Sequence, residues 1–87
     1  MVDVVMYTTM FCPFCVRAKQ MLKAKGVAFD EIDVTMSQVK RAEMTERSGG
    51  GRTVPQIFIG DELIGGCDEL YALEHAGELD GKLGLAA

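Results

Sequence analysis

The chain has 87 residues, of which 48% are hydrophobic and three are cysteines, and its formal net charge at pH 7 is −4. This length suits one small domain over residues 1–87, and the apolar content is sufficient for a core without disulfides. The acidic balance argues against nucleic acid as the main partner, because it leaves no basic stripe to neutralise phosphates.

The first part of the chain predicts a β–α–β unit. Residues 2–7 are β-rich and mostly apolar, as in a buried strand, and apolar residues recur at helical spacing over 13–25. Pro13 suits the first helical turn and Gly26 suits the end of the helix. A second strand is expected within 27–34, parallel to the first and joined to it by a right-handed crossover.

The second part predicts a helix, a hairpin and a last helix. Ser37 is the expected N-cap of a mostly polar helix that ends near Arg47. The hairpin strands are expected at 56–59 and 62–64 around a tight turn at Gly60 and Asp61, and the last main helix at 67–76. The tail is expected to form one short helix and then to fray. The resulting order, β-α-β-α-β-β-α, describes an α/β fold with a four-stranded mixed sheet flanked by helices.

The segment Cys12-Pro13-Phe14-Cys15 carries the strongest functional signal. A cysteine at the start of a helix faces unpaired N–H groups and the positive end of the helix dipole, and both favour the nucleophilic thiolate. Cys12 could therefore attack a disulfide, and Cys15 could resolve the product. A zinc site is the competing interpretation, but the chain adds only Cys67 and His75 as further ligands of this kind.

Two further segments could form a binding site beside this pair. Pro55 must lie at a strand start or edge, and a cis bond before it would turn the backbone of Val54 outward to pair with an extended peptide. Gly65-Gly66-Cys67-Asp68 opens the last helix. Its N–H groups could bind a carboxylate while Asp68 holds an ammonium, although Asp68 could equally be a helix cap.

The start of the chain bears on location. Asp3 interrupts the only early apolar run, which is too short for a signal peptide or a membrane span. We therefore expect a cytoplasmic protein with no membrane partner. A cysteine pair in that reducing compartment is catalytic or metal-binding rather than structural.

Together, three motifs resemble those of the glutaredoxins, most closely the short bacterial dithiol type of the glutaredoxin 3 kind. The motifs are Cys12 to Cys15, Thr53-Val54-Pro55-Gln56-Ile57-Phe58-Ile59, and Gly65-Gly66-Cys67-Asp68-Glu69-Leu70, and the resemblance extends over about residues 4–83. The resemblance implies a thioredoxin-type fold, a cis Val54–Pro55 bond and a groove for glutathione. Within it, Cys12 and Cys15 are catalytic, and the glutathione-binding residues are Tyr7, Phe14, Thr53, Val54, Pro55, Gly66, Cys67 and Asp68. To these we add Arg52 as a hypothesis of our own.

Two departures from the family pattern bear on the positive charge of the glutathione groove. Such proteins often carry a lysine three residues before the first cysteine, and this chain has Thr9 there. The loop 49–52 is also one residue longer than is usual. Our hypothesis is that Arg52 supplies the positive charge that Thr9 does not.

The resemblance implies a glutathione-dependent oxidoreductase that reduces protein disulfides and protein–glutathione mixed disulfides. Glutathione is then a co-substrate, no metal is expected, the protein partners are disulfide-containing or glutathionylated proteins, and the chain is expected to be a monomer. The alternative is a dimeric [2Fe–2S] carrier that uses Cys12 and glutathione as ligands, which Pro13 disfavours. A thioredoxin ranks below both, because no tryptophan precedes Cys12.

Overall fold

The computed structural model describes residues 2–85 and contains four strands and four helices in that range. In chain order the elements are β1 (Val4–Thr8), α1 (Pro13–Ala24), β2 (Asp30–Asp33), α2 (Gln38–Arg47), β3 (Gln56–Ile59), β4 (Glu62–Gly65), α3 (Cys67–His75) and α4 (Leu79–Lys82). The predicted four-stranded mixed sheet is confirmed. Its strand order is β2-β1-β3-β4, with β1 parallel to β2 and the other neighbours antiparallel.

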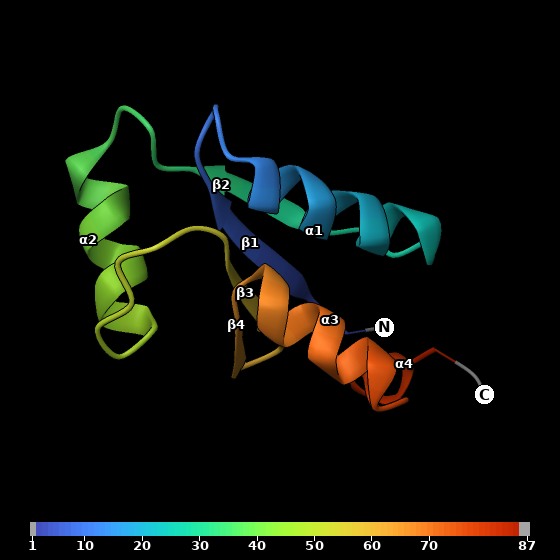
Figure 1. Cartoon of the computed structure of the whole chain (residues 1–87). Coiled ribbons are helices and arrows are strands. Elements are labelled where there is room, and N and C mark those ends of the chain that lie inside the picture. The colour runs from blue at the N-terminus through green and yellow to red at the C-terminus, as the bar shows by residue number, and fades with distance from the viewer. Residues whose placement is uncertain (1, 86–87) are drawn as a thin grey trace.

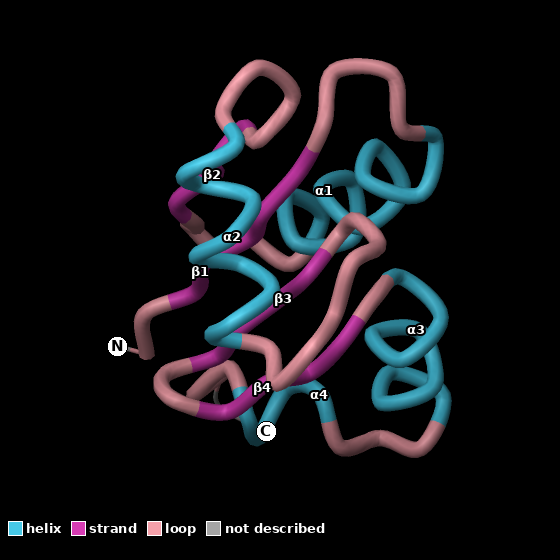
Figure 2. The backbone as a smooth tube through the Cα atoms, turned by 90° about the vertical axis from the view of Figure 1, so that its left-hand side faces the viewer, coloured by secondary structure: helices cyan, strands magenta, loops and turns pink. Residues whose placement is uncertain are grey.

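Helices cover both faces of the sheet (Figure 1). Helices α1 and α3 pack on one face, where Leu22 and Leu70 join Met6 and Ile57 in the main core. Helix α2 crosses the other face (Figure 2), where Met44 packs in a smaller cluster with residues from β1 and β3. The central strand β3 is buried along its whole length because it is covered on both faces.

The second strand, expected within residues 27–34, is present and begins only at Asp30. The reason lies at the end of α1, where Gly26 has φ +71°. The N–H of Gly26 bonds the Lys23 carbonyl at 3.0 Å, and that of Val27 bonds the Leu22 carbonyl at 3.0 Å. These two bonds form a Schellman motif, so the residues after Gly26 complete the helix end before the sheet begins.

The tail is more ordered than expected. Leu79 is fully buried and Leu83 is 4% exposed, and both belong to the main core. Lys25 also ties this segment to α1, since its ammonium lies 2.6 Å from the Asp80 carboxylate. The prediction of one short helix is therefore confirmed, but the expected fraying is wrong up to residue 85, and residues 86–87 lie outside the described part.

Candidate active site

Cys12 lies at the point where the chain leaves β1 and enters α1. It is the N-cap of α1, with φ −128° and ψ 101°, and its sulfur accepts a hydrogen bond from the Cys15 N–H at 3.1 Å. Pro13 follows at the first helical position, where its missing N–H costs nothing. The sulfur of Cys12 therefore faces the N–H groups of the first turn, where a negative charge is favoured.

Cys15 lies directly beneath Cys12 and is only 1% exposed. Burial, together with the side-chain hydrogen bond that the protonated Cys15 thiol makes with Cys12, raises the pKa of Cys15 to about 12. Cys15 is therefore a protonated thiol near neutral pH, and it cannot meet a large substrate directly. Cys12, with 9% of its surface exposed, is the sulfur of the pair that a substrate can reach.

The predicted cis peptide bond between Val54 and Pro55 is present. It faces the helix entry, and the Cys12 sulfur lies 3.8 Å from the Val54 carbonyl oxygen in a weak hydrogen bond. Two segments that are about 40 residues apart in the chain thus meet at one sulfur. The backbone carbonyl of Val54 thus lies directly beside the Cys12 sulfur.

A groove of about 280 Å³ runs from this point to the start of α3. A volume of this size, open to solvent, suits a small extended peptide better than a large ligand. The residues that line it come from α1, the cis-proline loop and α3, namely Phe14, Thr53, Val54, Pro55, Gly66, Cys67, Asp68 and Glu69. Seven of these eight residues are in the predicted glutathione-binding set.

The entry to α3 is built by glycine and a side-chain cap from Glu69. Gly65 has φ +111°, which a residue with a side chain rarely adopts, and a Cβ there would lie 2.7 Å from the Glu69 carboxylate. That carboxylate instead accepts a hydrogen bond from the Gly66 N–H at 2.7 Å. The remaining N–H groups of the first turn, with the exposed carboxylate of Asp68 beside them, offer one site for an anion and one for a cation.

Cys67 lines the same groove but is 5% exposed. Burial raises the pKa of the Cys67 thiol, and the nearby Asp68 carboxylate adds to this effect. The protonated thiol of Cys67 is therefore favoured over its thiolate, against the opposing charge of Arg17.

Two predicted binding residues lie away from this groove. Tyr7 is 1% exposed and packs toward α2, where its hydroxyl donates to Glu43 at 2.8 Å and accepts from Arg47 at 3.3 Å. The structure thus corrects the expectation that Tyr7 lines the groove: alternation along β1 turns its side chain to the α2 face. Arg52 lines a separate hollow against α2.

Sequence reasoning missed two residues. Glu69 lines the groove and caps α3, and its position three residues after Gly66 is a capping signal that could have identified it. Arg41 faces the hollow that contains Arg52, on a helix whose polar pattern gave no sign of a binding role. Arg41, Arg52 and the acidic Glu46 all line this hollow.

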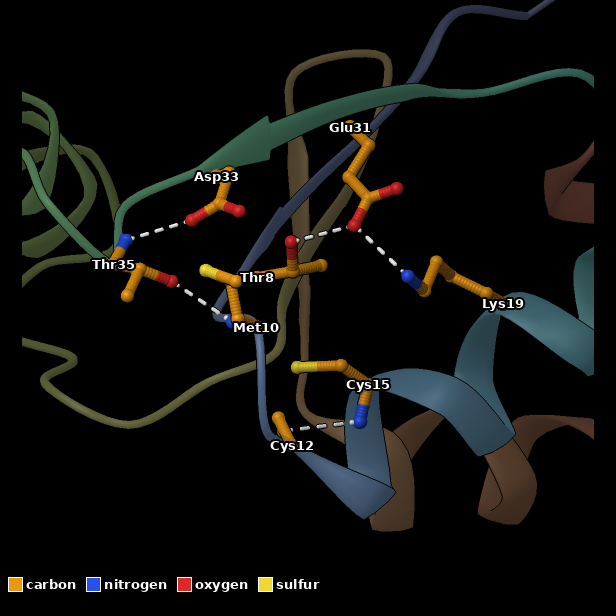
Figure 3. A network of polar contacts seen from close by, with 8 residues as sticks. All are labelled: Thr8, Met10, Cys12, Cys15, Lys19, Glu31, Asp33 and Thr35. Atoms are coloured by element: carbon orange, nitrogen blue, oxygen red, sulfur yellow. Dashed lines mark hydrogen bonds and ion pairs between the residues drawn. The ribbon is translucent and has the colours of Figure 1, made fainter.

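A polar network supports the helix from the other side (Figure 3). The Glu31 carboxylate accepts from Thr8 at 2.7 Å and from Lys19 at 2.9 Å, and these bonds lower the pKa of Glu31. Thr8 is fully buried at the end of β1. The network thus anchors α1, and with it the cysteine pair, to β1 and β2.

Two kinds of feature are absent from residues 2–85. No helix there is long and apolar enough to cross a membrane. No cluster of three or more His, Cys, Asp or Glu residues in that range is placed to hold a metal ion.

Comparisons with known proteins agree with the motifs. The family model for glutaredoxin matches residues 4–64. A glutaredoxin from Pseudomonas aeruginosa is 54% identical over 83 residues, which cover 95% of this chain and 98% of that protein. Glutaredoxin 3 from Escherichia coli K12 is 52% identical over 80 residues, covering 92% and 95%.

A solved structure agrees as well. The crystal structure of a buckwheat glutaredoxin–glutathione complex has a TM-score of 0.86 and 27% identity, covering 98% of this chain and 83% of that one. This agreement confirms the thioredoxin-type fold that the motifs imply.

Proposed function

The chain belongs to the glutaredoxin family, and we propose that it uses glutathione to reduce protein disulfides and protein–glutathione mixed disulfides. The observation that carries this proposal is the position of Cys12, which caps α1 at the end of a groove formed by the cis-proline loop and the α3 N-terminus. The family supports thiol oxidoreductase chemistry in general. The specific reaction is our inference from the groove.

For a mixed disulfide, the Cys12 thiolate attacks the sulfur of the bound glutathione. A new S–S bond joins Cys12 to glutathione, the original S–S bond breaks, and the protein thiolate leaves and takes up a proton from water. A second glutathione, as its thiolate, then attacks the glutathione sulfur on Cys12. Oxidised glutathione leaves and Cys12 is restored.

Cys15 has a role only when the substrate is a protein disulfide. Cys12 attacks one substrate sulfur, and Cys15 then loses its proton and attacks Cys12, forming an internal disulfide and releasing the reduced substrate. Two glutathione molecules reduce that internal disulfide. Because Cys15 is buried and protonated near neutral pH, we expect the mixed-disulfide route to proceed without it.

The groove matches the groups that glutathione presents. We propose that the backbone of Val54 pairs with the cysteinyl part, and that the first turn of α3 with Asp68 holds the carboxylate and ammonium of the γ-glutamyl end; the shared lining of the groove by these residues supports this. The buckwheat relative is described as a complex with glutathione. We propose that Arg52 and Arg41 attract the opposite carboxylate, at the glycyl end.

The test is glutathione-coupled reduction of the mixed disulfide between glutathione and free cysteine. Cys12→Ser should abolish turnover, whereas its matched partner Cys15→Ser should retain much of it. Full activity in Cys12→Ser would refute the mechanism. The absorbance spectrum of anaerobically purified protein tests the [2Fe–2S] alternative, for which a brown dimer is expected instead of the colourless monomer that we propose.

The groove itself is tested by Asp68→Asn. Removing this exposed charge should raise KM for the glutathionylated substrate about fivefold, which corresponds to ~1 kcal/mol, with little change in kcat. Arg52→Ala should raise KM as well. An unchanged KM in Arg52→Ala would show that Arg52 does not take over the charge that Thr9 lacks.

A further inference from the structure

Lys19 lies one helical turn after Cys15 on α1, and Figure 3 shows both side chains on the side of the helix that faces β1 and β2. Residues at this spacing have Cβ atoms about 5–6 Å apart. The Lys19 ammonium lies 2.9 Å from the Glu31 carboxylate, which also accepts from the buried Thr8 hydroxyl at 2.7 Å. The Lys19 side chain is only 25% exposed, so this cation is held in place near the buried thiol.

Cys15 has to ionise before it can act. Burial is the main cause that raises the pKa of Cys15, and the thiolate charge of Cys12 adds to it. Once Cys12 is joined to a substrate sulfur it carries no charge, so burial is the main obstacle that remains. A nearby positive charge opposes the effect of burial. Lys19 supplies such a charge and lowers the pKa of Cys15.

The other charged groups around the cysteines act elsewhere. Those at the start of α3, together with one arginine of α1, affect the pKa of Cys67, and an aspartate of β2 is itself affected by Lys19. These groups are Arg17, Asp33, Asp68 and Glu69. The guanidinium of Arg17 lies over the Tyr71 ring, 5.9 Å from its centroid, and so faces α3 rather than the strands.

We propose that Lys19 is a positioning residue for the resolving step, in which Cys15 attacks Cys12: its ammonium, held by Glu31 and Thr8, favours the loss of the Cys15 proton. This inference rests on the proposed function and deepens it. It concerns only the route through Cys15, because a second glutathione that attacks from solvent does not need the Cys15 thiolate.

The step balances as follows. Cys15 gives its proton to water, and its thiolate attacks the Cys12 sulfur. The Cys12–Cys15 bond forms, the bond from Cys12 to the substrate sulfur breaks, and that sulfur leaves as a thiolate and takes up a proton. The cysteine pair is thereby oxidised to a disulfide, and the substrate sulfur is reduced to a thiol.

The experiment isolates this step. Oxidised glutathione is used at pH 4 to form the mixed disulfide on Cys12, free glutathione is removed, and the pH is raised to 7.5. Release of glutathione then measures the attack of Cys15. The proteins are the wild type, Lys19→Gln, Lys19→Arg as the conservative variant, and Lys23→Gln as a matched control. Lys23 is an exposed lysine of the same helix, about 12 Å along the axis from Cys15.

Lys19→Gln should release glutathione about three- to fourfold more slowly than the wild type. An opposite charge at this spacing lowers a pKa by about 1–3. We take the low end because Lys19 shares its charge with Glu31. One pKa unit gives about tenfold less thiolate, and the more basic thiolate recovers a factor of about 2.5–3. Lys19→Arg and Lys23→Gln should behave as the wild type, and an unchanged or faster release in Lys19→Gln would overturn the proposal.

A second measurement separates charge from mere anchoring of α1. Alkylation of Cys15 by iodoacetamide is compared in proteins that also carry Cys12→Ser. Loss of the charge should slow alkylation about three- to fourfold, whereas a loosened helix would expose Cys15 and speed it up. Faster alkylation in Lys19→Gln would therefore refute the electrostatic role.

Glu31→Gln is used if circular dichroism shows that Lys19→Gln is unfolded. It removes the counter-charge of Lys19 and keeps an oxygen for Thr8, so glutathione release should be about two- to threefold faster, and an equal or slower release would contradict the proposal. A wild type that forms no mixed disulfide at Cys12 would instead refute the proposed function. The alkylation rates would still show whether Lys19 acts on Cys15.

Discussion

Alkylation of Cys15 by iodoacetamide should be far slower in the folded protein than in the same chain unfolded in guanidinium chloride. Folding raises the pKa of Cys15 from the ordinary thiol value of 9.0 to about 12. At pH 7.5 this lowers the thiolate fraction by about a thousandfold. The more basic thiolate is also a better nucleophile. With a Brønsted slope of about 0.4–0.5, its reaction rate per thiolate rises by a factor of roughly 15–30, which partly offsets the lower thiolate fraction.

The net expectation is a rate about 30- to 60-fold lower in the folded state, and restricted access can only lower it further. Tandem mass spectrometry that distinguishes Cys12 from Cys15 gives the rate at each sulfur. The unfolded chain is the control, because both sulfurs are then exposed. If Cys15 were alkylated at similar rates in the two states, or if its rate in the folded protein levelled off near pH 9, the reasoning about its burial would be refuted.

The same shift has a consequence for stability. The folded state holds the proton of Cys15 more tightly than the unfolded state does. The contribution of this proton to the unfolding free energy is therefore complete below pH 9 and is lost as pH rises toward about 12. In this window the unfolding free energy should fall by up to ~1.4 kcal/mol per pH unit from this one group. Denaturation curves of the wild type and Cys15→Ser give the difference, which should be flat below pH 9.

Three substitutions test other parts of the structure. Glu31→Gln should cost about 1 kcal/mol at pH 7, a small value because Glu31 is more than a third exposed. Since its partner Lys19 lowers the pKa of Glu31, this cost should shrink as pH falls below 4.5, and a constant cost in guanidinium denaturation would contradict the assignment. Leu79→Ala should cost about 2–5 kcal/mol if the tail is part of the core, whereas a loss below 1 kcal/mol would place it outside. Gly65→Ala should cost about 1–3 kcal/mol because of its positive φ and the contact with Glu69, and a neutral result would show that the turn can rearrange.

Much of the fold was predictable because its signals are local. Ser37 was predicted as an N-cap, and its hydroxyl accepts from the Lys40 N–H at 3.1 Å. Gly26 was predicted to end α1, and it does so with a positive φ. Each of these signals depends on backbone geometry within a few residues, so no tertiary contact is needed to interpret it.

The tail and the site depended on contacts that the sequence does not display. Leu79 follows a glycine in a short polar segment, and only its docking against α1 and α3 shows that it belongs to the core. Tyr7 was assigned to the groove by resemblance, and Arg52 by the hypothesis that it replaces a charge missing at Thr9. Strand alternation turns Tyr7 toward α2, and the path of the loop brings Arg52 to the hollow against α2.

The sequence by itself determined the two sulfurs, their place at a helix start, the proline that adopts a cis bond and the glycines that open α3. These are short-range patterns whose physical meaning does not change with context. Only the tertiary structure decided that the Cys12 sulfur meets the Val54 carbonyl, that Cys15 is buried, and that the Met10 N–H meets the Thr35 hydroxyl. The physical reason is that burial and proximity arise from packing between distant segments, and packing also determines which sulfur a substrate can reach and which one keeps its proton.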